Sequence, residues 1–153
     1  MTSTIYQASD LAQRRREFID EARKGCARLR DTDGAHLVMV PSGTFEVLVG
    51  LRDWLARDLR LELVLQRPWS ERRPVEFGDL AWLSVFDDDD QMEFHRELHE
   101  ALMLSLASDA LEPVDRCLRE WRTTAVALAD ETRRAVLTGA VSGDEFEDVG
   151  RPV

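Results

Sequence analysis

The first fifty residues constrain the fold of this chain more than any other stretch. They contain a β-prone run at 4–7, a polar helix, two short apolar-rich runs and the start of a second helix. The two apolar-rich runs, 26–30 and 35–40, are joined by Asp31-Thr32-Asp33-Gly34, residues typical of a hairpin turn. A unit of this size buries too little apolar surface to be stable alone, so we expect it to pair with a second copy of itself.

The polar helix is predicted to begin at Ser9, which can cap its first turn, and to end at Gly25. The apolar face of this helix consists of Leu11, Phe18, Ile19 and Ala22. Arg15 interrupts this face, four residues after the first of these positions and three before the second.

Arg14, Arg15 and Arg16 are the strongest functional signal in the chain. Arginine binds phosphate in a bidentate manner and reads guanine edges. A solvated basic face is the simpler explanation, but Arg15 stands where an apolar residue is expected unless a charge serves a purpose. We therefore predict that these three arginines contact DNA, with support from Arg28 and Arg30 on the adjacent strand.

A long amphipathic helix is predicted over about 45–66, opened by Ser42 or Thr44. Its apolar stripe is predicted to be Phe45, Leu48, Leu51, Leu55, Leu59 and Leu63. The run at 35–40 is the more apolar arm of the hairpin, so we expect it to be the more buried strand. For a partner protein, the predicted apolar anchors are Trp54, Leu55, Leu59 and Trp69, whereas Trp82 and Trp121 are expected to pack in a core.

Pro68, Pro74 and Gly78 indicate a linker at 67–78, which divides the chain into two parts. Residues 1–66 form the first part, and an acidic helical extension covers 79–138, with helices at about 90–107, 109–129 and 130–138. The run 87–90 is predicted to start the first of these helices, because carboxylates cap a helix N-terminus. Residues 139–153 are expected to form a flexible tail.

Charge is distributed unevenly along the chain. Residues 1–73 hold 13 Lys and Arg against 11 Asp and Glu, whereas residues 74–153 hold 7 against 19. This asymmetry favours an anionic partner for the first part and a cationic partner for the second, although acidic helices can also serve only to keep a protein in solution. No apolar run is long enough to span a bilayer, and the first residues do not resemble a signal peptide, so a cytoplasmic location is expected.

His95 and His99 lie four residues apart, as metal ligands on one helix face do. Arg96, however, stands where the zinc-protease motif requires glutamate. Cys26 and Cys117 lie far apart without CxxC spacing, which indicates buried, reduced free thiols, and neither has an evident base partner. We therefore expect no catalytic residue, no metal and no cofactor.

Residues 5–50 resemble the prevent-host-death (Phd/YefM-type) antitoxins of type II toxin–antitoxin systems. ASDLAQRRREF stands at the family's "SEAR..L" helix, LRDTDG at its "TR-x-x-G" turn, AHLVMVPS at its "AVLVS" strand, and GTFEVL at its "LEEY"-like helix start. The match departs from the family in the turn, where Asp31 and Asp33 replace residues that are often basic, and in the first helix. Ala12 occupies the place of the family arginine, and Arg15 stands where the family has an apolar residue.

The resemblance implies a protein that dimerises through its N-terminal sheet, binds the operator of its own operon as a repressor, and covers a toxin, often a ribonuclease, with the segment that follows. We therefore expect an α+β homodimer that is not an enzyme, with a small sheet-and-helix unit, a helical extension, and a cognate toxin and operator DNA as partners. One alternative is a protein-binding adaptor of the same fold that has lost DNA binding. Another is a small metal-binding helical protein that uses His95 and His99.

Overall fold

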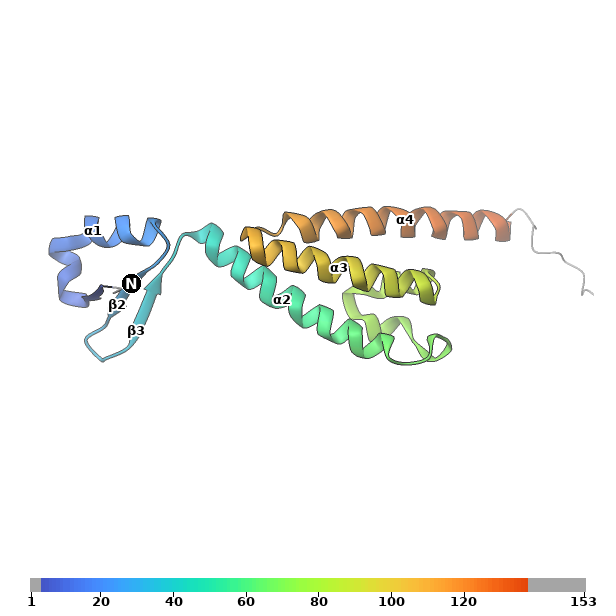
Figure 1. Ribbon diagram of the computed structural model, residues 1–153, viewed down its shortest axis with the longest axis horizontal. Coiled ribbons are helices and arrows are strands. Elements are labelled where there is room, and N and C mark those ends of the chain that lie inside the picture. Colours follow the sequence, from blue (N-terminus) through green and yellow to red (C-terminus); the bar gives the residue numbers. More distant parts are fainter. Residues whose placement is uncertain (1–3, 138–153) are drawn as a thin grey trace, which may run out of the picture.

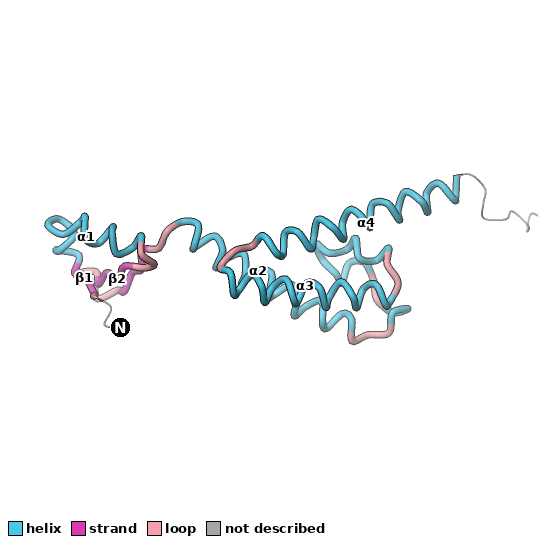
Figure 2. Tube along the Cα trace, turned by 45° about the horizontal axis from the view of Figure 1, so that its top comes forward, coloured by secondary structure: helices cyan, strands magenta, loops and turns pink. Residues whose placement is uncertain are grey.

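The computed structural model describes residues 4–137, and its architecture is mixed α+β, as predicted, with helix predominating. In the described residues the strands lie together at one end of an elongated molecule, beside helix α1, and the remaining helices form a second body (Figures 1 and 2). The tail predicted at 139–153 lies outside the described residues. Within them, no helix is both long enough and apolar enough to cross a membrane.

Strands β1 (Ile5–Gln7), β2 (Ala27–Arg30) and β3 (His36–Met39) form a small sheet in the order β1-β2-β3. Strand β1 runs parallel to β2, and β2 pairs with β3 in the antiparallel direction. The backbone N–H of Asp31 donates to the carbonyl of Ala35 at 2.8 Å, and Gly34 adopts a φ of 90°, which favours glycine. The predicted hairpin is therefore confirmed.

Helix α1 (Leu11–Arg23) follows a short 3₁₀ turn, η1 (Ala8–Asp10), and provides the crossover that a parallel strand pair requires. Phe18 and Ala22 on this helix are buried against Tyr6 and Ala27 of the sheet. The rings of Tyr6 and Phe18 meet edge to face with their centroids 5.3 Å apart. This cluster is the core of the first unit.

Of the two predicted ends of α1, the structure confirms the C-terminal one but not the N-terminal cap. Ser9 does not cap the helix; instead, Asp10 accepts a hydrogen bond from the backbone N–H of Gln7 at 2.9 Å. At the other end, the N–H of Gly25 donates to the carbonyl of Ala22 at 3.1 Å, and Gly25 has a φ of 153°. The predicted stop at this glycine is confirmed.

Strand β3 differs from its prediction as the more buried arm. All four of its residues are exposed, including Leu37 (50% exposed), Val38 (60%) and Met39 (44%). Helix α1 packs on β1 and β2, so the edge strand receives no cover from it. An apolar strand is buried only where another element reaches it, and in this chain none of the described elements does.

The second body consists of three long helices and two 3₁₀ segments. They are α2 (Ser42–Leu65), η2 (Trp69–Glu71), η3 (Pro74–Val85), α3 (Asp88–Ser108) and α4 (Glu112–Leu137). Helix α3 packs against both α2 and α4, and Figure 1 shows it lying between them. Helix α4 is continuous where two helices, 109–129 and 130–138, were predicted. The most buried members of the shared core are Leu61, Leu80, Leu83, Phe94, Leu98, Leu102 and Val114.

Asp87 caps α3 as predicted, since its carboxylate accepts a hydrogen bond from the N–H of Asp90 at 3.0 Å. The three acidic residues that follow Asp87 lie in the first turn, where they meet the positive end of the helix dipole. The Asp87–Asp90 run is therefore a helix start.

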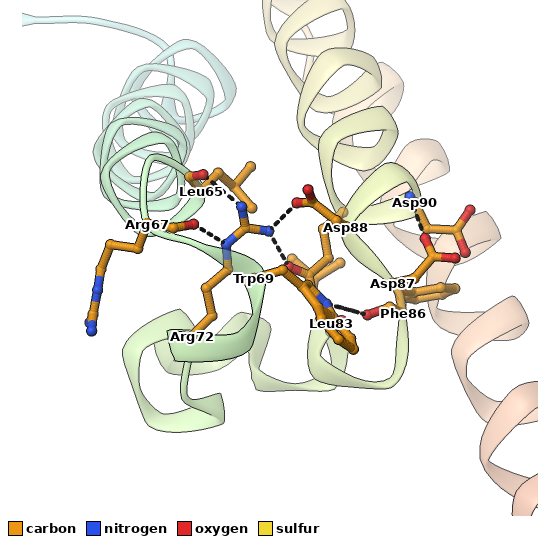
Figure 3. Close-up of polar contacts among 10 residues, drawn as sticks. Leu65, Arg67, Trp69, Arg72, Leu83, Phe86, Asp87, Asp88 and Asp90 are labelled. Carbon is orange, nitrogen blue, oxygen red and sulfur yellow. Dashed lines mark hydrogen bonds and ion pairs between the residues drawn. The ribbon is translucent and has the colours of Figure 1, made fainter.

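The segment 67–78 was predicted to be a linker, and the structure shows that this division of the chain is wrong. Phe77 is 4% exposed and belongs to the core that α2 shares with α3 and α4. The guanidinium of Arg72 donates to the carbonyls of Leu65 (2.7 Å) and Arg67 (2.9 Å), and its side chain is only 5% exposed (Figure 3). Helix α2 therefore belongs with the helices that follow it, and the two cores divide near Pro41.

Arg72 also ties this segment to the start of α3. Its Nη1 donates to Asp88 at 2.6 Å and to the side-chain oxygen of Gln91 at 3.0 Å. The side-chain amide of Gln91, which is buried, donates in turn to the carbonyls of Leu83 and Phe86 at 3.1 and 3.0 Å. The prolines and the glycine of segment 67–78 indicate only local chain direction. They could not reveal this hydrogen-bond network, because the acceptors of Arg72 and Gln91 come from three separate elements.

The predicted apolar stripe of α2 lies mainly at the surface of the helical body. Of its six positions only Leu51 is buried, and Leu55 is partly buried. The four others remain about half exposed or more: Phe45 (59%), Leu48 (54%), Leu59 (61%) and Leu63 (65%). The helix is apolar on two faces, and the contact with α3 selects the other one.

Candidate functional site

The candidate binding residues lie on two surfaces, one on each body. The first is the arginine surface of the sheet-and-helix unit, defined by Arg14, Arg15, Arg16, Arg28 and Arg30. The second lies on the helical body, where the exposed face of α2 adjoins a cavity between α2 and α3.

Arg14 is engaged within its own unit. Its guanidinium donates to the carboxylate of Glu17 through Nε at 3.0 Å and Nη2 at 2.7 Å, and it lies 5.0 Å from the centroid of the Tyr6 ring. The hydrogen bond to Glu17 raises the pKa of Arg14. Tyr6 in turn donates to Glu21 at 2.9 Å, and this bond raises the tyrosine's pKa. Arg14 is therefore the member of the triplet with the least freedom to meet a ligand.

Arg15 does not lie on the core-facing side of α1, so the argument from its position in the apolar face was wrong. The backbone at Arg14 leaves the helical region (φ −116°, ψ 23°), and this kink breaks the register between Leu11 and Phe18. Arg15 and Arg16 are both exposed. They remain the arginines best placed to contact an anionic partner.

Arg28 and Arg30 are exposed on the opposite face of the sheet from α1. Their neighbours in β2, Ala27 and Leu29, pack toward the helix, and successive residues of a strand point to opposite faces. The strand register places Arg28 between Ile5 and Val38 on this open face. Within one chain, therefore, the structure does not bring these two arginines together with the triplet on α1.

The predicted partner anchors separate into two groups. Trp54 and Leu55 are partly buried against the helical core, and Arg57 stacks over the Trp54 ring at 4.7 Å. Trp69 (50% exposed) and Leu59 (61%) remain at the surface. Trp82 and Trp121 pack with the core, as predicted, with both rings meeting Phe94 and Phe86 edge to face.

The exposed face of α2, defined by Phe45, Leu48, Leu59 and Leu63, includes one of the predicted partner anchors, Leu59. These four large apolar side chains lie on one helix, and each is more than half exposed. Exposed apolar side chains grouped on one face mark an interaction site more often than scattered single residues do.

Asp58 is the one carboxylate of the described residues that belongs to the buried set. It comes from α2 and meets two histidines of α3: Oδ1 lies 3.2 Å from Nε2 of His95, and Oδ2 lies 3.2 Å from Nδ1 of His99. The contact with His99 has hydrogen-bond geometry, whereas Oδ1 and the His95 nitrogen have the separation but not the geometry of a hydrogen bond. The shared face predicted for the two histidines is thus confirmed, and the acid that they flank was not foreseen.

These three residues line a cavity of about 700 Å³ between α2 and α3, which we call the acidic groove. Its lining consists of Asp58, Leu59, Glu62, Asp89, Met92, Glu93, His95, Arg96, His99 and Glu100. Arg96 contacts Glu93 and Glu100, both at 2.5 Å, and its hydrogen bond lowers the pKa of Glu93. Carboxylates therefore outnumber the guanidinium groups by five to one in this lining.

Nothing in the described residues is built as a metal or nucleophile site. No group of three or more histidine, cysteine, aspartate or glutamate side chains there has an arrangement that could hold a metal ion. Cys117 is buried, and this burial raises the pKa of its thiol to about 11, which disfavours the reactive thiolate. Cys26 is exposed, so the prediction of a buried thiol is wrong at this position.

Comparisons with known proteins add no relative: no family model, no curated protein and no solved structure matches the chain.

Proposed function

We propose that this chain is an antitoxin of Phd-like organisation, which binds a cationic toxin through its helical body and operator DNA through its N-terminal unit. The observation that carries the proposal is the separation of charge between the two bodies. With the boundary at Pro41, residues 1–40 have a net charge of +1, and residues 41–137 have a net charge of −8. Each body thus attracts a partner of the opposite sign.

A second copy of the chain is the natural cover for β3. This edge strand presents Leu37, Val38 and Met39 together with unpaired backbone groups, and an uncovered edge is an open template for pairing. A symmetric dimer would bury these residues and present Arg15 and Arg16 twice, as binding to two DNA half-sites requires.

The toxin would meet the exposed face of α2 and the acidic groove beside it. Ribonucleases hold phosphate with cationic side chains, so a surface rich in carboxylates can cover their binding site and speed association. Leu59 and Trp69 are the predicted anchors that remain exposed. Trp54 and Leu55 contribute mainly through their packing in the helical core.

The DNA arm of the proposal is tested by titrating the protein with DNA from immediately upstream of its gene and with a scrambled duplex, at two salt concentrations. The double variant Arg15→Ala/Arg16→Ala should weaken binding to the native duplex by about tenfold or more and reduce the salt dependence, because phosphate contacts are lost. Arg116→Ala/Arg119→Ala, which removes two exposed arginines of α4, is the matched control. Equal binding to both duplexes would exclude sequence-specific repression.

The toxin arm is tested separately. Co-expression with the neighbouring gene should yield a stable complex and restore growth if that gene encodes a toxin. A Leu59→Asp/Leu63→Asp variant should abolish the complex, since it places charge on the exposed face of α2 without touching the core. An unchanged complex would remove this face from the proposed interface.

A second candidate function is a protein-binding adaptor that retains the fold and has lost DNA recognition. The engagement of Arg14 by Glu17 and the placement of Arg28 and Arg30 on the far side of the sheet favour it. The same DNA titration separates the two functions, because the adaptor would bind neither duplex.

A further inference from the structure

The acidic groove contains a buried carboxylate, Asp58, with one oxygen that has no hydrogen-bond partner among the described residues. Asp58 is 5% exposed, and among its two histidine contacts only the one to His99 has hydrogen-bond geometry. A histidine carries a charge only when protonated, so neither neighbour gives Asp58 the permanent partner that an arginine would. Burying a carboxylate is costly unless a cation or several donors accompany it. Oδ1 of Asp58 is therefore an acceptor that a cationic ligand in the groove could use.

The one arginine among the described residues that line the groove, Arg96, already forms ion pairs within the protein. Arg96 pairs with Glu93 and Glu100, and its high pKa reflects these hydrogen bonds. Glu62 and Asp89 also line the groove, and the ion pairs of the described residues include neither of them. These two carboxylates come from different helices, α2 and α3, so a ligand between them would contact both walls.

The groove is apolar as well as acidic. Leu59 (61% exposed) and Met92 (49% exposed) line it beside the carboxylates. A hydrated metal ion gains nothing from such residues. An arginine side chain does, because its aliphatic stem packs on apolar surface while its planar guanidinium binds carboxylates in a bidentate manner. A volume of about 700 Å³ exceeds what one side chain needs, so a short basic segment fits the space better than a single residue.

We propose that the acidic groove between α2 and α3 is the docking site for an arginine-rich segment of a basic protein. The guanidinium groups would meet Asp58, Glu62 and Asp89, and the aliphatic stems would lie on Leu59 and Met92. The inference rests on the proposed function in one respect, since it gives the chemistry by which the helical body recognises its toxin.

The test uses the full chain and two fluorescent peptides, nona-arginine and nona-lysine, titrated at low and at physiological ionic strength. We expect nona-arginine to bind more tightly than nona-lysine at both, because only the guanidinium binds carboxylates in a fork. The double variant Glu62→Gln/Asp89→Asn should weaken arginine binding about tenfold. Glu46→Gln/Glu131→Gln removes the same charge from exposed positions outside the groove and should have less than a twofold effect.

A second variant, Met92→Lys, keeps every carboxylate and adds a tethered ammonium group at a half-exposed position. It should abolish the preference for arginine, because its own cation occupies the groove. Equal affinity for the two peptides, or equal loss in the groove and control variants, would show that attraction is only a matter of net charge and would overturn the proposal. Neither result affects operator binding or complex formation with the neighbouring gene product, so failure of this inference is distinct from failure of the proposed function.

Discussion

Replacement of Arg72 by methionine is the sharpest test of the fold, because it removes the charged end of a nearly buried side chain and keeps its stem. The guanidinium donates to four acceptors, which are contributed by Leu65, Arg67, Asp88 and Gln91. Without the donor, the carbonyl of Leu65 and the side chain of Gln91 are left unsatisfied in partly buried surroundings.

The magnitude follows from these contacts. A hydrogen bond to a charged donor contributes about 1.5 kcal/mol or more to stability, so the loss of the two buried partners costs about 3 kcal/mol. Asp88 is 55% exposed and regains water, so its ion pair adds less than about 1 kcal/mol. We therefore expect Arg72→Met to lower the free energy of unfolding of the helical body by about 3–4 kcal/mol.

The assay is urea denaturation followed by tryptophan fluorescence. All four tryptophans, at positions 54, 69, 82 and 121, lie in the helical body, so the signal reports that body alone. Arg67→Met is the matched control: Arg67 is 44% exposed and pairs with Glu76 at the surface, so its loss should cost less than about 1 kcal/mol. If Arg72→Met costs no more than the control, then the segment 67–78 behaves as the linker that its prolines indicate, and the structural reasoning is refuted.

Three further predictions follow from local geometry. At pH 8 a water-soluble thiol reagent should modify Cys26 rapidly and Cys117 only on unfolding. Because the pKa of Cys117 is raised to about 11, its contribution to stability should decline as pH rises from about 9 toward 11, which Cys117→Ala would abolish. Gly43→Ala enters open space and should be neutral or stabilising by up to about 1 kcal/mol, whereas Gly50→Ala should gain less, because the end of the Leu111 side chain lies 2.5 Å from the new methyl group and must move aside; thermal unfolding measures both.

Features set by neighbouring residues were predictable from the sequence. The hairpin turn ending at Gly34, the stop of α1 at Gly25 and the cap at Asp87 all depend on contacts within a few residues, and the structure confirms all three. The face shared by His95 and His99 is likewise a consequence of helical spacing.

Features that depend on residues far apart in the sequence could not be predicted. Helix α2 has apolar residues on two faces, and only the position of α3 decides that Leu61 is buried and Leu63 is exposed. Strand β3 is apolar yet uncovered, since α1 packs elsewhere. The same limit explains the misassigned segment 67–78, whose anchor, Arg72, finds acceptors up to 19 residues away.

The candidate sites, too, were predictable only where they depend on residues close in the sequence. Arg15 and Arg16 are exposed, as residues that contact DNA must be. The argument that Arg15 interrupts the apolar face of α1 was wrong, because the kink at Arg14 shifts the helical register between Leu11 and Phe18. A signal for the acidic groove did exist: Asp58 interrupts the apolar sequence of α2 at a core-facing position, just as Arg15 was thought to do in α1. That signal becomes informative only when α3 supplies the two histidines.

The shared core of the helical body has a consequence for how long the free protein survives. A segment that folds only on a partner incurs the ordering entropy, about 1–2 kcal/mol per residue for the backbone, at the moment of binding. Here the exposed face of α2 and the groove beside it are already held by a core that needs no partner. A protease can cut this region only after it opens, so the lifetime of the free protein depends on the stability of the helical body itself.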